Sequence, residues 1–140
     1  LKNLNTEAID ILLIHSNGND LDIINQSDAV ETLIEIKKKG LAKNIGMSTY
    51  SSQGTLAASV FSDVIMATLN LEDSSNLEAI KNAHKKGCGI LLKKVFSSGK
   101  CHIKESLEFV FKHKEIHSAV IGTINKTHLR ENVNLVSKFF

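Results

Sequence analysis

Five short apolar runs, each followed by a segment with helical periodicity, constrain the fold of this chain more than any other feature. The runs lie at residues 9–14, 45–48, 64–69, 89–92 and 119–121. Apolar runs bounded by polar residues are typical of strands that are buried on both faces. Strands that alternate with helices at this spacing form parallel sheets built from βαβ units. The sequence therefore predicts an α/β fold in a single domain that spans residues 1–140.

Start and stop signals flank the helical segments. Two pairs of residues match the capping box, and two glycines follow the segments as C-terminal stops. These are Asp28 with Glu31, Ser75 with Glu78, Gly40 and Gly87. Weaker periodicity predicts further helices at residues 53–61, around 107–111 and at 129–136, whereas residues 15–27 are predicted to form a polar loop.

Repeated βα units form either a doubly wound sheet or a (β/α)8 barrel. No G-x-G-x-x-G motif follows the first apolar run, so the dinucleotide-binding doubly wound fold loses its main support. A complete barrel needs about 250 residues and eight units. The chain is therefore predicted to form a partial TIM barrel of about five βα units, and its first and last strands would have unpaired edges.

Composition argues against several classes of partner and site. No apolar run reaches the roughly 18 residues of a membrane span, and no basic and apolar leader opens the chain, so the cytoplasm is expected. The formal net charge is +2, with one Tyr and no Trp, which does not favour nucleic-acid binding. Cys88 and Cys101, together with His84 and His102, match no standard zinc spacing, so reduced thiols and no metal site are expected.

Ligands of parallel α/β folds bind where the carboxyl ends of the strands meet. The residues at these positions include no carboxylate pair and no Ser or Cys nucleophile with a base, which indicates a binding surface for a polar ligand. They are His15, Ser16, Ser48, Thr49, Asn70, Lys93, Lys94 and residues 122–125. For His15 two interpretations stay open, a catalytic imidazole and a hydrogen-bonded core residue.

The last unit has the features of a phosphate site. A strand ends near residues 122–123 and a helix begins near residues 125–128, and free N–H groups at a helix start attract phosphate. Hydroxyl, amide and cationic donors surround this point: Thr123, Asn125, Lys126, His128 and Arg130. The alternative is an ordinary N-cap followed by a solvated basic helix face, and the spacing does not decide between the two.

Three stretches resemble motifs of the aldo/keto reductase family. Residues 9–16, IDILLIHS, are similar to its strand DLLLIH, and residues 29–49 are similar to ALEELKKEGKIRAIGVSN. Residues 120–132, VIGTINKTHLREN, resemble the C-terminal signature IPGTRSPEHLRENL. Their order and spacing also agree, so the resemblance covers nearly the whole chain, starting at the family's fourth barrel strand.

The resemblance implies a (β/α)8 barrel that uses NADPH, or less often NADH, to reduce aldehydes and ketones. The family's catalytic residues are Asp, Tyr, Lys and His, and only the histidine has a counterpart here, at His15. The other three belong to elements before the fourth strand. Tyr50 follows the second apolar run and does not match the catalytic tyrosine.

The resemblance also implies a set of cofactor residues. Ser48 and Thr49 match the pair that holds the nicotinamide carboxamide, Lys94 and Gly99 lie near the pyrophosphate, and the C-terminal residues match the adenosine and 2′-phosphate end. The full set is Ser48, Thr49, Asn70, Lys94, Gly99, Thr123, Asn125, His128, Glu131 and Asn132. Three positions depart from the family pattern. Met66 replaces a carboxamide-binding Gln, and Lys93 replaces an aromatic residue that stacks on nicotinamide. His128 replaces a common Arg. Cofactor binding is therefore expected to be weakened or lost in this chain alone.

Three functions are compatible with these observations. The first is that the chain is part of a longer oxidoreductase that acts on a small carbonyl substrate. The second is a non-catalytic half-barrel that associates with a partner chain, or with itself, through its exposed edge strands. The third is an NADP-binding module without turnover.

We expect no measurable carbonyl reduction by this 140-residue chain. A positioned proton donor contributes about 10²–10⁴-fold to such a reaction, and the family's donor and its two supporting residues have no counterpart here. The test is NADPH oxidation in the presence of an aldehyde such as 4-nitrobenzaldehyde, and steady consumption would contradict the expectation.

Overall fold

The computed structural model describes residues 1–99 and 102–139 and contains a five-stranded parallel sheet. The strands are β1 (Ile9–His15), β2 (Ala42–Ser48), β3 (Val64–Thr68), β4 (Gly89–Lys93) and β5 (Ser118–Ala119), and their order in the sheet is their order in the chain. This sequential parallel order, with helical connections between the strands, is that of part of a (β/α)8 barrel. The predicted fold class and the partial barrel are therefore confirmed.

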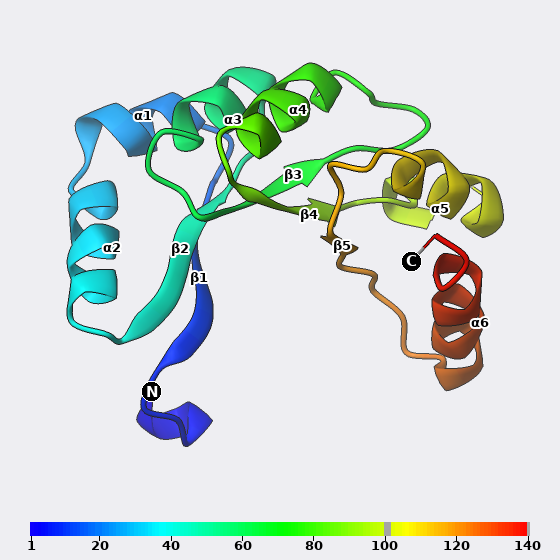
Figure 1. Ribbon diagram of the computed structural model, residues 1–140, viewed down its shortest axis with the longest axis horizontal. Coiled ribbons are helices and arrows are strands. Elements are labelled where there is room, and N and C mark those ends of the chain that lie inside the picture. Colours follow the sequence, from blue (N-terminus) through cyan, green and yellow to red (C-terminus); the bar gives the residue numbers. More distant parts are fainter. Residues whose placement is uncertain (100–101, 140) are drawn as a thin grey trace.

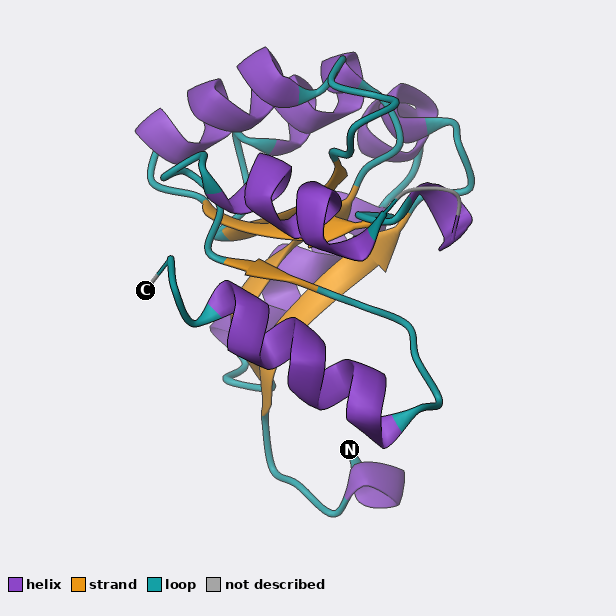
Figure 2. Ribbon diagram, turned by 90° about the vertical axis from the view of Figure 1, so that its right-hand side faces the viewer, coloured by secondary structure: helices purple, strands orange, loops and turns teal. Residues whose placement is uncertain are grey.

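The helices form an arc around the outside of the strands (Figure 1). They are α1 (Asp20–Gln26), α2 (Ala29–Lys38), α3 (Ser52–Ala58), α4 (Leu77–Lys85), α5 (Ile103–Phe111) and α6 (Lys126–Val136), with short 3-10 helices at Lys2–Leu4 and Ser97–Gly99. Seen from the side in Figure 2, α6 lies below the strands and most other helices lie above them, as expected of helices that follow a curved sheet.

The main core lies between the strands and this arc of helices. Burial alternates along β3 and β4 with a period of two residues, so one side chain in two faces the helices. The buried side chains of this face come from strands and helices alike, and include Ile65, Ala67, Ile90, Leu92, Ile80, Leu107 and Val110. A smaller cluster around Leu33, Ala42 and Ile45 joins α2 to β2.

The opposite face of the sheet corresponds to the inside of a barrel and is only partly covered by the described residues. Met66 and Leu91 on this face are half-buried, and Ile11 is 39% exposed. The prediction that residues 9–14 are buried on both faces is therefore wrong. Because β1 is an edge strand of this sheet, no residue of β1 is fully buried.

The predicted loop at residues 15–27 contains a helix, α1, which local sequence signals did not reveal. Its first residue, Asp20, is 2% exposed, and its carboxylate accepts hydrogen bonds from the N–H groups of Tyr50 (3.0 Å) and Ser51 (2.7 Å). The Ser51 hydroxyl also donates to Asp20, at 2.7 Å. A Cβ at Gly54 would overlap the Asp20 carboxylate, so the close packing of α1 on α3 requires glycine there. A tertiary contact therefore fixes α1.

The two capping boxes are not formed. Asp28 is the N-cap residue of α2, but its side chain makes no cap hydrogen bond. The N-cap residue of α4 is Asn76 rather than Ser75, and the Ser75 hydroxyl donates to Asp73 at 2.6 Å. The glycine stops are confirmed: Gly40 and Gly87 adopt φ values of 72° and 93°, which other residues rarely adopt.

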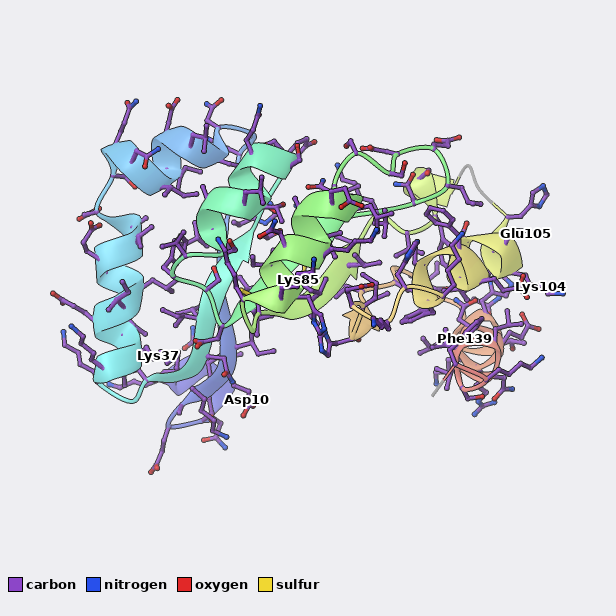
Figure 3. The ribbon with its side chains drawn as sticks, turned by 45° about the horizontal axis from the view of Figure 1, so that its top comes forward. Asp10, Lys37, Lys85, Lys104, Glu105 and Phe139 are labelled. Atoms are coloured by element: carbon purple, nitrogen blue, oxygen red, sulfur yellow. The ribbon has the colours of Figure 1, made fainter. Side chains whose placement is uncertain are left out.

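An ion pair joins α2 to Asp63, the residue directly before β3. Lys37 lies at the end of α2 (Figure 3), and its ammonium contacts both carboxylate oxygens of Asp63 at 2.6 Å. The same carboxylate accepts a hydrogen bond from the Ile45 N–H at 2.9 Å. Burial raises the pKa of Asp63, but the bonds from Lys37 and Ile45 outweigh burial and hold that pKa below its ordinary value.

Replacing Asp20 by Asn is expected to lower the free energy of unfolding at neutral pH by about 1–3 kcal/mol, because an NH2 donor replaces one of the two oxygens that accept hydrogen bonds from Tyr50 and Ser51. Burial raises the pKa of Asp20, but hydrogen bonds from Ser16, Ser51 and Tyr50 bring it below its ordinary value of 3.8. A lowered folded-state pKa stabilises the fold above pH ~4, and this contribution is lost as pH falls through the lowered pKa. Urea unfolding of both proteins across pH should therefore show a difference that shrinks in acid.

The exposed carboxylate of Asp10, paired with Lys43, provides the control, since Asp10→Asn should have no measurable effect. A pH-independent difference for Asp20→Asn would contradict the assignment.

Gly46→Ala is expected to destabilise the sheet by about 1–3 kcal/mol or more. A Cβ at Gly46 would overlap the backbone carbonyl of Val64, its partner in the register of β2 and β3. Gly89→Ala is the matched control, because its Cβ would lie 3.5 Å from the Val64 side chain, an ordinary contact. Equal midpoints of thermal unfolding for the two variants would show that β2 and β3 do not approach as described.

Candidate functional site

The register of the sheet gathers the strand ends on one rim. His15 pairs with Ser48, Ser48 pairs with Met66, and the end of β3 pairs with the end of β4 through Thr68 and Lys93. Because all the strands are parallel, their carboxyl ends lie at the same edge, as predicted from the sequence.

Lys93 and Ser48 meet across this rim. The Lys93 ammonium donates a hydrogen bond to the Ser48 hydroxyl oxygen at 2.9 Å. The two residues come from β4 and β2, with β3 between them. Inward-pointing side chains of alternate strands share a layer in barrels of this kind, which explains how residues of non-adjacent strands touch.

Tyr50 lies beside two lysines, Lys93 at the end of β4 and Lys94 in the loop that follows. Its ring centroid is 5.4 Å from the Lys93 Nζ and 4.7 Å from the Lys94 Nζ, and its hydroxyl is 3.2 Å from the Lys94 Nζ. The Lys94 hydrogen bond and charge lower the pKa of Tyr50 from its ordinary value of 10.0. The sequence did not predict this contact, because nothing in the spacing relates Tyr50 to the end of β4.

Lys94 also has an unusual backbone conformation. Its φ is 56°, and Ser97 in the same loop has a φ of 46°. A left-handed conformation costs about 1–2 kcal/mol for a residue with a Cβ. Strain of this kind concentrates at binding and catalytic sites, which supports the loop after β4 as part of the functional rim.

Thr49 and Asn70, two predicted cofactor residues, are buried and hydrogen-bonded within the chain. The Thr49 hydroxyl contacts the Thr55 hydroxyl at 2.7 Å. The Asn70 amide donates to the Lys94 carbonyl at 3.1 Å, and its oxygen accepts hydrogen bonds from two backbone N–H groups of the following loop. Both residues therefore shape the rim, and their contact with a cofactor stays a prediction.

Two of the predicted residues share a cavity between the loops that follow β4 and β5. Lys94 and Gly99 line this space of about 360 Å³ together with Gly122. Lys94 also borders the adjoining cavity beside Tyr50 and Asn70, of about 310 Å³. The loop after β4 thus connects the rim beside Ser48 to the last βα unit.

The start of α6 has the N-cap that the sequence left as an alternative to a phosphate site. The Asn125 side-chain oxygen accepts hydrogen bonds from the N–H groups of Thr127 (2.9 Å) and His128 (3.4 Å). Thr123, His128 and Glu131 are exposed around this cap. A phosphate that bound here would therefore depend on these exposed side chains more than on those two backbone groups.

Asn132 differs from its neighbours because it is only 3% exposed. Its side-chain oxygen is buried and has no hydrogen-bond partner among the described residues. It lines a cavity of about 430 Å³ between α6, α5 and β5, whose other walls are mainly apolar: Phe111, Ala119, Ile121, Leu129, Val133 and Val136. An unpaired buried acceptor is costly, so this position favours a ligand or partner that brings a donor.

His15 ends β1 and is exposed, so the interpretation as a buried core histidine is wrong. Its neighbour Ser16 is buried, and the Ser16 N–H donates to the Ser48 carbonyl at 3.2 Å. The backbone therefore holds the imidazole at the rim, next to the strand end that carries Ser48.

The remaining sequence expectations concern the cysteines and the membrane. Cys88 is buried, and burial raises the pKa of its thiol. Cys101 lies outside the described residues. Within residues 1–99 and 102–139, no three His, Cys, Asp or Glu side chains lie close enough together to hold a metal ion. None of the described helices is long and apolar enough to cross a membrane.

Known proteins resemble this chain in sequence and in structure. A sequence model described as the aldo/keto reductase family matches residues 1–71. No curated protein matches the chain. The crystal structure of PA4992 from Pseudomonas aeruginosa, a protein assigned as an aldo-keto reductase, has 37% sequence identity and a TM-score of 0.93 over 99% of this chain.

Two more distant structures share the fold. The aldo-keto reductase AKR11C1 from Bacillus halodurans, in its holo form, has 16% identity and a TM-score of 0.83 over 97% of this chain. The glycerol dehydrogenase AKR11B4 from Gluconobacter oxydans has 16% identity and a TM-score of 0.54 over 99% of this chain. The chain spans 54% of the Pseudomonas protein, 58% of the Bacillus protein and 42% of the Gluconobacter protein.

Because Tyr50 is the only tyrosine and the chain has no tryptophan, its ionisation can be followed directly by tyrosinate absorbance. We expect Tyr50 to titrate below 10 in the folded chain, because the nearby Lys94 charge favours the phenolate. Lys94→Met should raise the midpoint, because it removes the hydrogen bond and the nearer of the two charges. Lys104→Met on α5, where Lys104 faces Glu108, should leave it unchanged. An unaltered midpoint in the Lys94 variant would contradict the contact.

Proposed function

Because this chain belongs to the aldo/keto reductase family, we propose that it forms the part of an NADP(H)-dependent oxidoreductase barrel that binds the adenosine end of the cofactor and presents His15 to a carbonyl substrate. The observation that carries the proposal is the unpaired buried oxygen of Asn132 in a largely apolar cavity. The cofactor, when bound, supplies hydride.

The adenosine end of the cofactor fits the residues of the last βα unit. An adenine ring is flat and largely apolar, and its exocyclic amine is a donor that would satisfy the Asn132 oxygen. The cavity lies against α6, and the exposed side chains of Thr123, Asn125 and His128 lie near the start of the same helix. A 2′-phosphate would find hydroxyl, amide and imidazole donors there, although a neutral imidazole is a weaker partner than a guanidinium.

The nicotinamide end fits less well. The Ser48 hydroxyl already accepts a hydrogen bond from Lys93, and Thr49 is fully buried. Met66 carries no amide to pair with a carboxamide. The internal bonding of Ser48 and the burial of Thr49 therefore leave fewer groups free for a nicotinamide carboxamide than the family resemblance implies.

His15 remains the residue proposed to orient the substrate. It is exposed at the rim beside Ser48, where a carbonyl oxygen could accept a hydrogen bond from the imidazole. Small aldehydes and ketones are the proposed substrate class, in the cytoplasm.

The unpaired edges of the sheet bear on the partners of the chain. β1 and β5 each pair with one neighbouring strand, and the face that corresponds to a barrel interior is only partly covered by the described residues. Eight strands close a barrel of this type. Further βα units, in the same polypeptide or a second one, are the proposed partners of these edges, and self-association through them is the alternative.

A second candidate function is nucleotide binding without turnover. The poor fit at the nicotinamide end favours it, because the adenosine contacts do not depend on Ser48 or Thr49. If the chain is part of an oxidoreductase, carbonyl reduction should appear when the first βα units of a family member are added to it. A binding module would bind NADPH and stay inactive under that condition.

We expect the folded chain to bind NADPH weakly, with the adenosine half supplying the affinity, in a calorimetric titration. Asn132→Leu removes the amide that would pair with adenine and should weaken binding roughly tenfold, the value of a hydrogen bond of about 1.4 kcal/mol. His128→Arg should strengthen binding of NADPH but not of NADH, because only NADPH has the 2′-phosphate. Lys38→Arg on α2, at the opposite end of the arc of helices from α6 (Figure 1), is the control. Absence of binding to well-folded protein would reject the proposal.

A further inference from the structure

Lys93 has surroundings that nicotinamide binding does not explain. It is half-buried at the carboxyl end of β4, and its nearest polar partner is the hydroxyl oxygen of Ser48, at 2.9 Å. Ser48 itself is 3% exposed. The Lys93 side chain is therefore fixed at its tip, with a neutral acceptor rather than a carboxylate.

No ion pair neutralises this amine within the part of the chain that the structure describes. The carboxylate of Asp20 interacts with it only over a longer range, and the oxygens of Asp20 accept hydrogen bonds from Tyr50 and Ser51. The exposed ammonium of Lys94 approaches the same tyrosine ring as Lys93 does. Two amines therefore share one region of the rim.

These surroundings make the neutral form of Lys93 more accessible than that of an exposed lysine. Burial lowers its pKa, the Lys94 charge lowers it further, and Asp20 and Tyr50 oppose the shift only in part. A neutral amine has a lone pair that can attack carbon, and lysines whose charge is disfavoured by burial or a second cation are the ones that form Schiff bases.

We propose that Lys93 is a nucleophilic amine that condenses with aldehydes or ketones at the rim of the sheet to form an imine. Three geometric features support this assignment: the position at the carboxyl end of a barrel strand, the tip held by Ser48, and the second amine beside it. Carbonyl compounds reach catalytic groups at this end of such barrels.

The reaction balances without any oxidant, reductant or cofactor. The Lys93 nitrogen attacks the carbonyl carbon, and a proton from nitrogen passes to the carbonyl oxygen to give a carbinolamine. The carbon–oxygen bond then breaks, the remaining N–H proton joins the departing hydroxyl so that water leaves, and a carbon–nitrogen double bond forms. One N–H of the neutral amine can donate to Ser48 during the attack, which leaves the lone pair directed away from that hydroxyl. This activity goes beyond the proposed reductase and needs no nucleotide.

Reductive trapping tests the proposal on the full 140-residue chain. The chain is incubated near neutral pH with a limiting amount of benzaldehyde and cyanoborohydride, which reduces an imine to a stable benzylamine, and the modified lysines are located by peptide mass spectrometry. Lys93 should be labelled several-fold faster than exposed lysines such as Lys94 and Lys104. The preference should vanish in urea, because it depends on the folded surroundings.

Variants separate the amine from its environment. Lys93→Arg keeps a cation beside Ser48 and should abolish the fast phase, whereas Lys104→Arg should leave it intact. Ser48→Ala should reduce the preference for Lys93, because the amine is no longer held. Labelling of Lys93 no faster than that of exposed lysines would overturn the proposal. If inorganic phosphate slowed the labelling of Lys93 and Lys94 and neither was labelled faster than exposed lysines, the two lysines would form an anion site, and the proposal would also be overturned. Loss of NADPH binding leaves these outcomes unchanged, so the two proposals fail independently.

Discussion

Backbone hydrogen bonds between β1, β2, β3 and β4 hold the strands in one parallel register, and every feature of the rim depends on that register. It places His15 beside Ser48 and Ser48 beside Met66. Because side chains of alternate strands face each other inside a barrel, the same register brings Lys93 of β4 to Ser48 of β2. Gly46 permits this pairing, since a side chain there would overlap the neighbouring strand.

The sequence was sufficient to predict the order of the elements and the end of the sheet at which the polar residues gather. Apolar runs and glycine stops are local signals, and Gly40 and Gly87 end their helices as predicted. It was insufficient for α1, because that helix depends on a buried carboxylate that binds backbone groups thirty residues away. It was also insufficient for the capping boxes: the Asp28 side chain makes no cap hydrogen bond, and the N-cap of α4 is Asn76 rather than Ser75. Local patterns do not fix the residue at which a helix begins.

For the candidate site, too, the sequence indicated some residues and missed the contacts that those residues make. Family resemblance indicated Ser48, Thr49 and Asn70 as a group, but Thr49 and Asn70 are hydrogen-bonded within the chain and Ser48 is bonded to Lys93. The contact between Tyr50 and the two lysines had no sequence signal, because it joins the loop after β2 to the end of β4. Asn132 was indicated by resemblance alone, and its unpaired oxygen now supplies a physical reason to consider it a ligand contact. The cavity around Asn132 and the rim around Lys93 are therefore two chemically different regions of the chain.

The rim around Lys93 depends on the packing of side chains from β2 and β4 across β3. Nuclear Overhauser contacts between the terminal methylene protons of Lys93 and the β-protons of Ser48 measure that packing directly in solution. The structure requires these contacts, since the nitrogen of Lys93 lies 2.9 Å from the hydroxyl oxygen of Ser48. Their absence in a folded chain that retains the backbone contacts between β2 and β3 would contradict this arrangement of the rim.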